Sequence, residues 1–294
     1  MSRRKKLLIL GATGMAGHVA YTYLNEIGKY DIATVCHSRK IEPNSYELDI
    51  YDTERLNEII QVEKPDAVIN CIGILIKGSK KNPANAIYIN AYFPHKLSEI
   101  LLSGLPESKV IHISTDCVFS GEEGNYKDTD QKNALDIYGM TKNLGELIND
   151  KDLTIRTSII GPELKKNGEG LMHWVFNQRE VGELNGYQKS IWGGVTTLEL
   201  AKIIDVALDN GITGLYQASN NVGIAKYDLI SLIVKEFNLP IKVNPVEGVI
   251  CDKSIWNSER KDISYQVASY DKMISDIHEF MISHKSLYKQ YLGE

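Results

Sequence analysis

Short apolar segments alternate with longer amphipathic segments through the first 160 residues, and this alternation limits the possible folds more than any other feature. The apolar segments lie at 7–10, 32–36, 67–71, 110–113 and 153–157. Helical spacing of apolar side chains lies between them, at about 14–27, 52–62, 84–103 and 134–149. Strands that are apolar throughout and alternate with helices pair in parallel, and helices cover both faces of their sheet. The sequence therefore predicts an α/β fold with a doubly wound parallel sheet.

The pattern changes after about residue 158, where Gly and Asn become frequent and the regular alternation stops. We therefore predict two parts, a Rossmann domain at 1–160 and a smaller substrate-binding lobe at 161–294. Within the lobe, helical patterns lie at 196–209, 226–237 and 270–284, and a strand pattern lies at 213–217. We expect some of these elements to return to the sheet, so that the two parts interleave.

The composition is that of an ordinary globular protein, with 294 residues and 43% hydrophobic side chains. The chain has 33 Lys and Arg against 38 Asp and Glu, a formal net charge of −5. Nucleic-acid-binding domains usually present a basic face, so this acidity argues against broad nucleic-acid binding. The first apolar run is too short for a signal peptide, and no run approaches the roughly 18 apolar residues of a membrane-spanning helix. We therefore expect neither a nucleic-acid nor a membrane partner.

The cysteines indicate a reducing compartment. Cys36, Cys71, Cys117 and Cys251 form no CxxC pair and have no ligand-like spacing to the seven histidines. Such cysteines are typical of reduced thiols in a cytosolic protein. We predict a cytoplasmic protein without a metal site.

A glycine-rich segment, GATGMAG at 11–17, directly follows the first strand and opens the first helix. Glycines in such a turn let the backbone approach a pyrophosphate, and the helix N-terminus offers it free N–H groups and partial positive charge. A tight connection without a ligand is the alternative. The position at the first strand-to-helix junction favours a dinucleotide site. Its predicted contacts are Gly11, Thr13, Gly14, Met15 and Gly17.

The end of the second strand indicates which dinucleotide is bound. Folds that prefer NAD usually carry an acidic residue there for the ribose 2′-hydroxyl. This chain has Ser38, Arg39 and Lys40 instead, and two cations suit a 2′-phosphate. We therefore predict NADP(H), with NAD(H) as the alternative, unless Arg39 and Lys40 only form a solvated turn.

Asp49 follows a short extended segment and could accept a hydrogen bond from an adenine amino group, with Ile50 beside it. It could equally cap a helix, as we expect of Asp52.

Tyr138 and Lys142 form a YxxxK pair. Positions i and i+4 share one helix face, so the ammonium can lie near the phenol, favour its ionised form and reach a ribose hydroxyl. A phenol with its pKa lowered in this way can act as general acid to a carbonyl oxygen. Tyr92 and Lys96 have the same spacing, but Pro94 interrupts them. Tyr138 instead comes 23 residues after Thr115, at the end of an apolar strand.

These motifs together carry a family resemblance. GATGMAG, NCIG at 70–73, HISTDCVFSG at 112–121, YGMTK at 138–142 and RTS at 156–158 resemble the extended short-chain dehydrogenase/reductases. The nearest branch is that of dTDP-4-dehydrorhamnose reductase and related nucleotide-sugar 4-keto reductases. The resemblance implies NADPH-dependent reduction of the 4-keto group of a nucleotide-activated 4-keto-6-deoxy sugar, for cell-surface polysaccharide precursors. It also implies a homodimer.

The resemblance also implies roles for single residues. Tyr138 is the proton donor, Lys142 is the ribose ligand that activates the phenol, and Thr115 holds the substrate carbonyl. Further cofactor contacts follow the third strand, at Cys71, Ile72 and Gly73.

Departures from the family pattern leave the substrate and reaction open. Related 4,6-dehydratases carry Thr-Asp-Glu where this chain has Thr115, Asp116 and Cys117, so dehydration is disfavoured. The GDP-fucose synthase branch places a catalytic Cys at the corresponding position, so Cys117 is either a pocket wall or an epimerisation base. The sugar is either dTDP-4-dehydrorhamnose or a UDP-4-keto-6-deoxy-N-acetylhexosamine. A non-catalytic NADP-binding regulator is a hypothesis of another class.

Candidate substrate contacts are Asp116, Cys117, Arg156, Arg179 and Trp192. The two arginines could bind a diphosphate as bidentate donors, and Trp192 could wall the sugar or base pocket. Alternatively, Arg156 ties the strand end to a carboxylate and Trp192 packs in the core.

Overall fold

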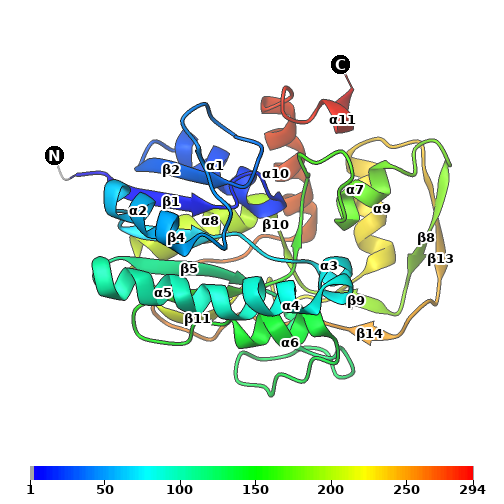
Figure 1. Ribbon diagram of the computed structural model, residues 1–294. Helices are drawn as coiled ribbons and strands as arrows, with labels where there is room; N and C mark the ends of the chain where they lie inside the picture. Colours follow the sequence, from blue (N-terminus) through cyan, green and yellow to red (C-terminus); the bar gives the residue numbers. More distant parts are fainter. Residues whose placement is uncertain (1–2, 294) are drawn as a thin grey trace.

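The computed structural model describes residues 3–293 and contains a seven-stranded sheet at its centre (Figure 1). Residues 1–2 and 294, which belong to the predicted ranges, lie outside the described part. The strand order is β11-β6-β5-β4-β1-β2-β3, and every neighbouring pair is parallel. This confirms the predicted doubly wound α/β fold. The strands are β1 (Lys5–Leu10), β2 (Tyr30–Cys36), β3 (Tyr46–Glu47), β4 (Ala67–Asn70), β5 (Lys109–Ser114), β6 (Leu153–Arg156) and β11 (Gly214–Gln217).

Alternate side chains of β1 enter two hydrophobic cores, one on each face of the sheet. Leu7 and Ile9 pack in the core that includes α1 (Met15–Glu26) and α8 (Thr197–Asp209). Leu8 and Leu10 pack in the other core, under α2 (Thr53–Glu63) and α5 (Phe93–Gly104). Figure 1 shows these helices on either side of the strands. Because both faces are covered, the strands are hydrophobic throughout.

The helix predicted at 84–103 is present but irregular. It consists of α4 (Pro83–Ala86), the π-helical segment η1 (Ile87–Tyr92) and α5, and a short helix α3 (Ile76–Lys81) precedes it. A π-helical turn inside a helix often marks a functional site. Here it holds Asn90, whose side chain accepts a hydrogen bond from the Ile74 N–H at 2.8 Å and donates one to the Ile74 carbonyl at 2.9 Å. The turn therefore fixes the segment that follows β4.

The helix α6 (Ile137–Leu144) is shorter than the predicted range 134–149. Asp136 caps its start by accepting a hydrogen bond from the Gly139 N–H at 2.7 Å. At its end, Gly145 lies against the Asn90 carbonyl, where a Cβ would come within 1.9 Å of the oxygen. After this contact the chain turns inward, so the helical pattern does not continue to 149.

After β6 the chain forms elements outside the central sheet, on the right of Figure 1, and it also returns to the sheet. β11 pairs with β6 at the sheet edge, α8 covers β1 beside α1, and α10 (Tyr270–Ser283) packs on both α8 and α9. The elements outside the central sheet and its covering helices, together called the second lobe, are β7 (Ile159–Ile160), α7 (Leu171–Phe176), β8 (Glu183–Tyr187), β9 (Ser190–Trp192), β10 (Val195–Thr196), β12 (Ile224–Ala225), α9 (Lys226–Glu236), β13 (Lys242–Val246), β14 (Cys251–Asp252) and α11 (Lys289–Leu292).

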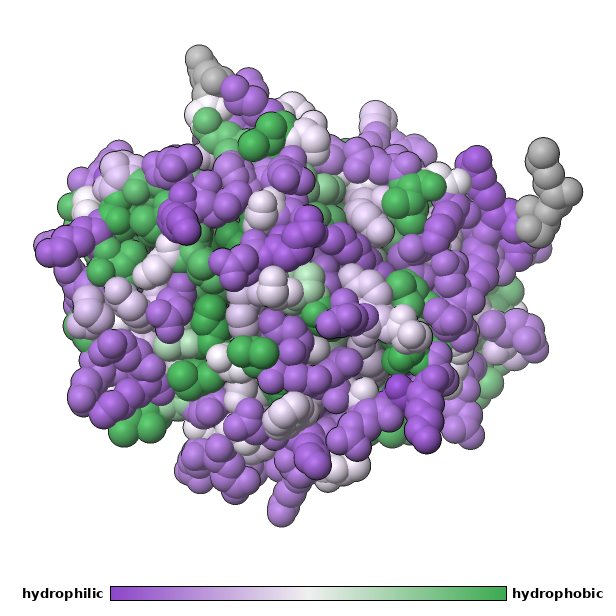
Figure 2. All heavy atoms as spheres, turned by 180° about the vertical axis from the view of Figure 1, so that it is seen from behind, coloured by the Kyte–Doolittle hydropathy of each residue, from purple (hydrophilic) through white to green (hydrophobic). Residues whose placement is uncertain are grey.

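Seen from behind, the surface is mostly hydrophilic, with hydrophobic residues in separate patches (Figure 2). Among the described residues, no helix has the length and apolar character to cross a membrane.

Candidate active site

The carboxyl ends of β1, β4 and β5 lie side by side because these strands are neighbours in a parallel sheet. Open α/β sheets bind their ligands at this edge. The segments that follow these three strands carry the glycine turn, residues 71–73 and residues 115–117. The structure therefore brings the predicted cofactor turn and the predicted catalytic strand end to the same edge.

The glycine turn forms a tight cradle at the start of α1. Gly11 has a φ of +75°, and a Cβ there would lie 3.0 Å from Ile72 Cγ1. A Cβ on Gly17 would lie 2.2 Å from the Gly11 carbonyl oxygen, so α1 approaches the turn only because this residue is glycine. Gly14 caps α1 without a side-chain hydrogen bond. The first-turn N–H groups of Met15 and its neighbours are thus uncapped, which suits a pyrophosphate.

The turn after β2 carries Ser38, Arg39 and Lys40, all exposed. The Arg39 Nη1 donates a hydrogen bond to the Leu164 carbonyl at 2.9 Å, so this side chain bridges to the second lobe. Burial lowers the pKa of His18 to about 4, and the Arg39 charge contributes to this shift. His18 lies in α1, so the Arg39 charge acts on the helix that follows the glycine turn.

Two further predicted cofactor residues follow β3. Asp49 is exposed, and its Oδ1 accepts a hydrogen bond from the Tyr51 N–H at 3.2 Å. Ile50 is buried in the core under α2. Asp52 caps α2 by accepting from the Arg55 N–H at 2.9 Å, which confirms the predicted cap.

The segment after β4 contains the predicted contacts Cys71, Ile72 and Gly73. The Ile72 N–H donates to Asn70 Oδ1 at 3.1 Å, and Asn90 Oδ1 lies 3.6 Å from the position of a Cβ on Gly73. Two asparagine side chains thus hold this segment next to the glycine turn.

Thr115 and Tyr138 are brought together by a close helix approach. Gly139 lies directly on the backbone after β5, where a Cβ would come within 2.1 Å of the Cys117 carbonyl oxygen. Thr115 is buried, and its hydroxyl donates to Asp116 Oδ1 at 3.1 Å and accepts from the Cys117 N–H at 3.2 Å. The glycine between the tyrosine and the lysine of the motif therefore lets the phenol reach the strand end.

Tyr138 holds its proton firmly. Burial raises the pKa of the phenol above its ordinary value. The neighbouring Cys117 and Asp116 add to this rise, and a hydrogen bond with the Thr115 side chain opposes it. Lys142, which we predicted to lower this pKa, is not among the groups that shift it here. The Lys142 Nζ donates to the Ile113 carbonyl at 2.6 Å. Burial lowers its own pKa to about 8, and Glu146 and Cys71 oppose this shift.

Asp116, which is buried, and Cys117, which is half-buried, lie beside Thr115. Burial raises the pKa of Asp116, and Lys253, Thr115, Cys117 and Ser158 oppose the rise. Burial and the neighbouring Asp116 raise the pKa of the Cys117 thiol to about 12. A thiol with this pKa is protonated at neutral pH, so Cys117 suits a pocket wall better than a base.

Lys253 is a site residue that the sequence did not reveal. Its stem packs on Gly121, where a Cβ would lie 2.9 Å from Lys253 Cγ. Burial lowers its pKa, but Cys117, Asp116, Cys251 and Asp136 outweigh burial, so that the pKa is raised. Lys253 is therefore a cation from the second lobe next to the strand end of Thr115. Its segment is held there by the pairing of β14 with β9 and by a hydrogen bond from the Asp252 N–H to the Gly121 carbonyl at 2.7 Å, and no motif marks it.

We expect Lys253→Met to raise KM for the sugar substrate by roughly 10- to 100-fold, as for a lost hydrogen bond to a charged group. The methionine keeps the stem on Gly121, and the Kd for NADPH should stay unchanged. Lys189→Met is the matched control, because Lys189 pairs with Glu247 on the surface at 3.1 Å. Equal KM values for the two variants would exclude a substrate contact.

Arg156 does not face a diphosphate. Its side chain is fully buried, and it binds Glu146 through two hydrogen bonds, Nε to Oε1 at 2.8 Å and Nη2 to Oε2 at 2.7 Å. Its Nη1 donates to Gln217 Oε1 at 3.0 Å. The predicted diphosphate contact is therefore wrong, and the alternative tie to a carboxylate is correct.

Arg179 and Trp192 also have structural partners. The Arg179 guanidinium lies over the Phe176 ring at 4.4 Å and donates to the Tyr291 carbonyl. It lines a cavity of about 460 Å³ that contains none of the predicted cofactor or catalytic residues. Trp192 is buried in the core, and its Nε1 donates to Ser158 Oγ at 2.8 Å. Phe176 and Tyr291 thus hold Arg179, and Trp192 packs in the core, which is the alternative that the sequence left open.

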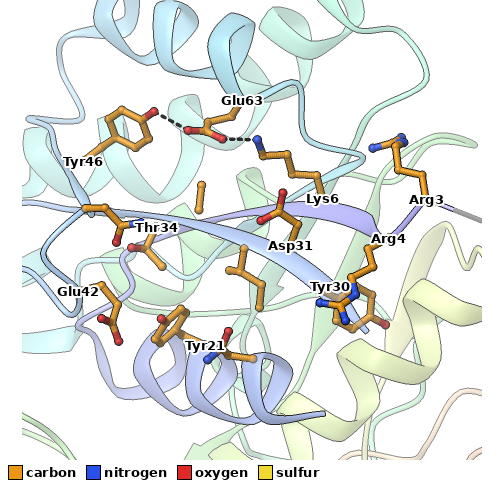
Figure 3. Close-up of a pocket in the computed structure, with 14 residues that line it drawn as sticks. Arg3, Arg4, Lys6, Tyr21, Tyr30, Asp31, Thr34, Glu42, Tyr46 and Glu63 are labelled. Carbon is orange, nitrogen blue, oxygen red and sulfur yellow. Dashed lines mark hydrogen bonds and ion pairs between the residues drawn. The ribbon is translucent and has the colours of Figure 1, made fainter. Parts of the chain in front are cut away.

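A second cavity, of about 830 Å³, lies along β2 and α1 (Figure 3). Its lining extends from Tyr30 at the start of β2 to Asn44 beyond the end of that strand, and it includes none of the predicted site residues. Lys6 pairs with Glu63 there at 2.6 Å, and Glu63 also accepts from Tyr46. The cavity is thus distinct from the predicted site.

Comparisons with known proteins show the family to which the chain belongs. The family model described as RmlD substrate binding domain matches residues 5–253. The probable low-salt glycan biosynthesis reductase Agl14 of Haloferax volcanii is 29% identical over 75% of this chain and 76% of that protein. The dTDP-4-dehydrorhamnose reductase of Aggregatibacter actinomycetemcomitans is 26% identical over 79% of both chains. Methionine adenosyltransferase 2 subunit beta of Xenopus tropicalis is 23% identical over 80% of this chain and 73% of that protein.

Solved structures share the fold. The dTDP-4-dehydrorhamnose reductase of Bacillus anthracis, in complex with NADP, superposes with a TM-score of 0.81 at 21% identity, over 95% of this chain and all of that chain. The dTDP-glucose 4,6-dehydratase of the same organism, in complex with NAD, gives a TM-score of 0.75 at 16% identity, over 97% and 99%. NADP and NAD are the two cofactors that the sequence predicts. The chain belongs to the RmlD substrate-binding domain family, and with it to the NAD(P)-dependent extended short-chain dehydrogenase/reductases.

Proposed function

We propose that this chain reduces the 4-keto group of a nucleotide-activated 4-keto-6-deoxy sugar with NADPH, in the synthesis of a cell-surface polysaccharide precursor. The observation that carries the proposal is the close approach of Gly139 to the Cys117 carbonyl, which brings Tyr138 to Thr115 at the edge that also holds the glycine turn. The substrate is dTDP-4-dehydrorhamnose or a UDP-4-keto-6-deoxy-N-acetylhexosamine. Two relatives support this class of substrate, because one is named as a dTDP-4-dehydrorhamnose reductase and the other as a probable glycan biosynthesis reductase.

Each residue has a defined part in such a reduction. NADPH, when bound, supplies the hydride for the ketone carbon. The glycine turn and the α1 N-terminus hold the pyrophosphate, and Lys142 binds the ribose. Because its pKa is raised, Tyr138 keeps its proton until negative charge develops on the sugar oxygen, and it then donates that proton. The Thr115 hydroxyl then turns from Asp116 Oδ1 to the same oxygen, donates a hydrogen bond to it and stabilises the charge.

The proposal is tested by offering 4-keto-6-deoxy sugars linked to dTDP, UDP and GDP and following the loss of NADPH absorbance. One of the dTDP- or UDP-linked sugars should be reduced at C4. Sugar isomerisation without net NADPH oxidation would indicate an epimerase that uses Cys117. NADPH binding without any reaction would indicate a non-catalytic regulator. We include this hypothesis because the chain is also similar to a methionine adenosyltransferase subunit.

We expect NADPH to be preferred over NADH because of Arg39. A charge-assisted hydrogen bond to the 2′-phosphate contributes roughly 1.5–3 kcal/mol, equivalent to at least about a tenfold preference. Arg39→Met should remove most of this preference, whereas Arg55→Met, in the exposed pair with Glu58, should not change it. The measurement is the ratio of kcat/KM for the two cofactors. A wild-type ratio that is equal or favours NADH would contradict this expectation.

A homodimer is part of the proposal. Exposed apolar side chains gather on and beside α6, on Leu135, Met140, Leu144 and Ile148. A second copy covering them would double the mass of 33.0 kDa in light scattering. Leu144→Glu should give monomers, whereas Val62→Glu, on α2, should not.

The four free cysteines suit a reducing cytoplasm as the compartment.

A further inference from the structure

A buried row of polar side chains leads from the end of β4 to the lysine of the YxxxK motif. Asn70 and His112 are fully buried, and Lys142 is 4% exposed. The Asn70 Nδ2 lies 3.2 Å from His112 Nδ1, and His112 Nε2 lies 3.3 Å from Lys142 Nζ. Lys142 Nζ also donates to the Ile113 carbonyl at 2.6 Å. The proposed reduction assigns no role to His112.

The direction of these hydrogen bonds follows from Asn70. Its Oδ1 accepts from the Ile72 N–H at 3.1 Å, so the amide turns its NH₂ group toward His112. His112 Nδ1 must then be the acceptor. The imidazole is neutral, because burial and the nearby Lys142 and His95 hold its pKa well below the usual range. A neutral imidazole that accepts at Nδ1 carries its proton on Nε2, which faces Lys142.

This arrangement favours one protonation state of Lys142. An ammonium opposite the His112 Nε2–H would place two donors against each other. A neutral amine accepts from Nε2–H through its lone pair and still donates to the Ile113 carbonyl. We propose that His112 is a positioning residue that stabilises the neutral amine of Lys142, and that Lys142 takes up a proton when the cofactor ribose binds. The inference rests on the proposed NADPH site.

The other groups around Lys142 do not reverse this preference. Glu146, on the same helix, favours the ammonium, but its carboxylate is bound by Arg156. Cys71, after β4, also favours the ammonium. Burial raises the pKa of the Cys71 thiol to about 12, so it is uncharged near neutral pH. Burial outweighs both groups and lowers the pKa of Lys142 to about 8.

Proton uptake on NADPH binding tests the proposal and needs no sugar substrate. Calorimetry in buffers of different ionisation enthalpy gives the number of protons taken up between pH 7 and 9.5. The 2′-phosphate does not interfere there, because the second pKa of a phosphate monoester is about 6. Uptake by the wild type should rise toward one proton above pH 8, and its affinity for NADPH should fall by up to about tenfold per pH unit.

Two variants should remove this behaviour by different routes. His112→Gln offers an amide oxygen that accepts from the ammonium. Asn70→Asp accepts from both the Ile72 N–H and His112 Nδ1–H, so the imidazole proton moves to Nδ1 and Nε2 becomes an acceptor. Both changes should shift the onset of proton uptake upward by about one pH unit or more, so that each variant binds NADPH up to about tenfold more tightly than the wild type at pH 9.5.

His95→Gln is the matched control, because His95 is exposed and contacts the Leu144 carbonyl rather than Lys142. It should keep the wild-type pH dependence. If both His112→Gln and Asn70→Asp bind NADPH with wild-type proton uptake, the inference is wrong while the proposed function stands. A wild-type chain that binds no NADPH would overturn the proposed function together with the inference.

Discussion

A Tyr138→Phe variant is expected to lose turnover by a factor of about 10²–10⁴ while its affinity for NADPH stays at the wild-type value. The substitution removes only the phenolic hydroxyl, which is the proton donor in the proposed reduction. The ring stays in place, so the approach of Gly139 to the strand end is unaffected. Steady-state kcat and the Kd for NADPH, measured on the same preparation, separate the two effects.

Tyr92→Phe is the matched control for this prediction. Tyr92 has the same spacing to a lysine, but it lies in the π-helical segment and is 51% exposed. Its loss should leave kcat unchanged. If Tyr138→Phe retains more than about half of the wild-type kcat, Tyr138 is not the proton donor.

An Arg156→Met variant is expected to lower the free energy of unfolding by about 3–5 kcal/mol, because it leaves Glu146 as a buried charge without its main partner. Both side chains of the pair are almost completely buried, at 0% and 1% exposure. Methionine keeps much of the apolar volume of arginine. The loss of unfolding free energy therefore comes mainly from the unpaired charge and not from a cavity. Urea unfolding followed by circular dichroism measures it.

The exposed pair of Arg55 and Glu58 provides the control, since Arg55→Met should cost less than about 1 kcal/mol. Adding Glu146→Gln to Arg156→Met should recover part of the loss, because no buried charge then remains. A loss as small as that of the control would show that the pair contributes little.

The pair also gives the wild type a pH dependence. Burial alone would raise the pKa of Glu146, but Arg156, Ser114 and Lys132 lower it below its usual value. A carboxyl group with a lowered folded-state pKa stabilises the fold above the unfolded-state pKa of about 4.3, and the contribution is lost as the pH falls through the folded-state pKa. The wild type should therefore lose stability below about pH 4, and the Arg156→Met/Glu146→Gln variant should lose less over this range.

The sheet could be predicted because its strands are apolar on both faces. Leu7 to Leu10 must all be buried in such an architecture, and the structure places them alternately in two cores. The long helices at 196–209, 226–237 and 270–284 were equally predictable from their spacing. The short strands of the second lobe, such as β9 and β14, have only two or three residues each. They are held by pairing between distant segments, which local spacing does not reveal.

A site residue could be predicted where its role depends only on the conformation of its own segment of backbone. Gly11, with its positive φ at the first strand-to-helix junction, is of this kind. Arg156 was not, because a guanidinium after a strand suits a diphosphate as well as a carboxylate, and only the inward turn of Glu146 after α6 decides between them. Lys253 was not predictable either, since its neighbours Asp116 and Gly121 lie more than 130 residues earlier in the chain.

The measurement that tests the central claim most directly is the fate of two isotopes in one reaction. The purified chain is given NADPH carrying deuterium on its transferable hydrogen and, in a separate sample, unlabelled NADPH in deuterated water, each with the dTDP- and UDP-linked 4-keto-6-deoxy sugars. We predict deuterium from the cofactor at C4 of the sugar, one NADPH consumed per product, and no enzyme-dependent solvent deuterium at C5. Solvent deuterium at C5 without net NADPH consumption, or no label at C4 from any of these sugars, would contradict the account.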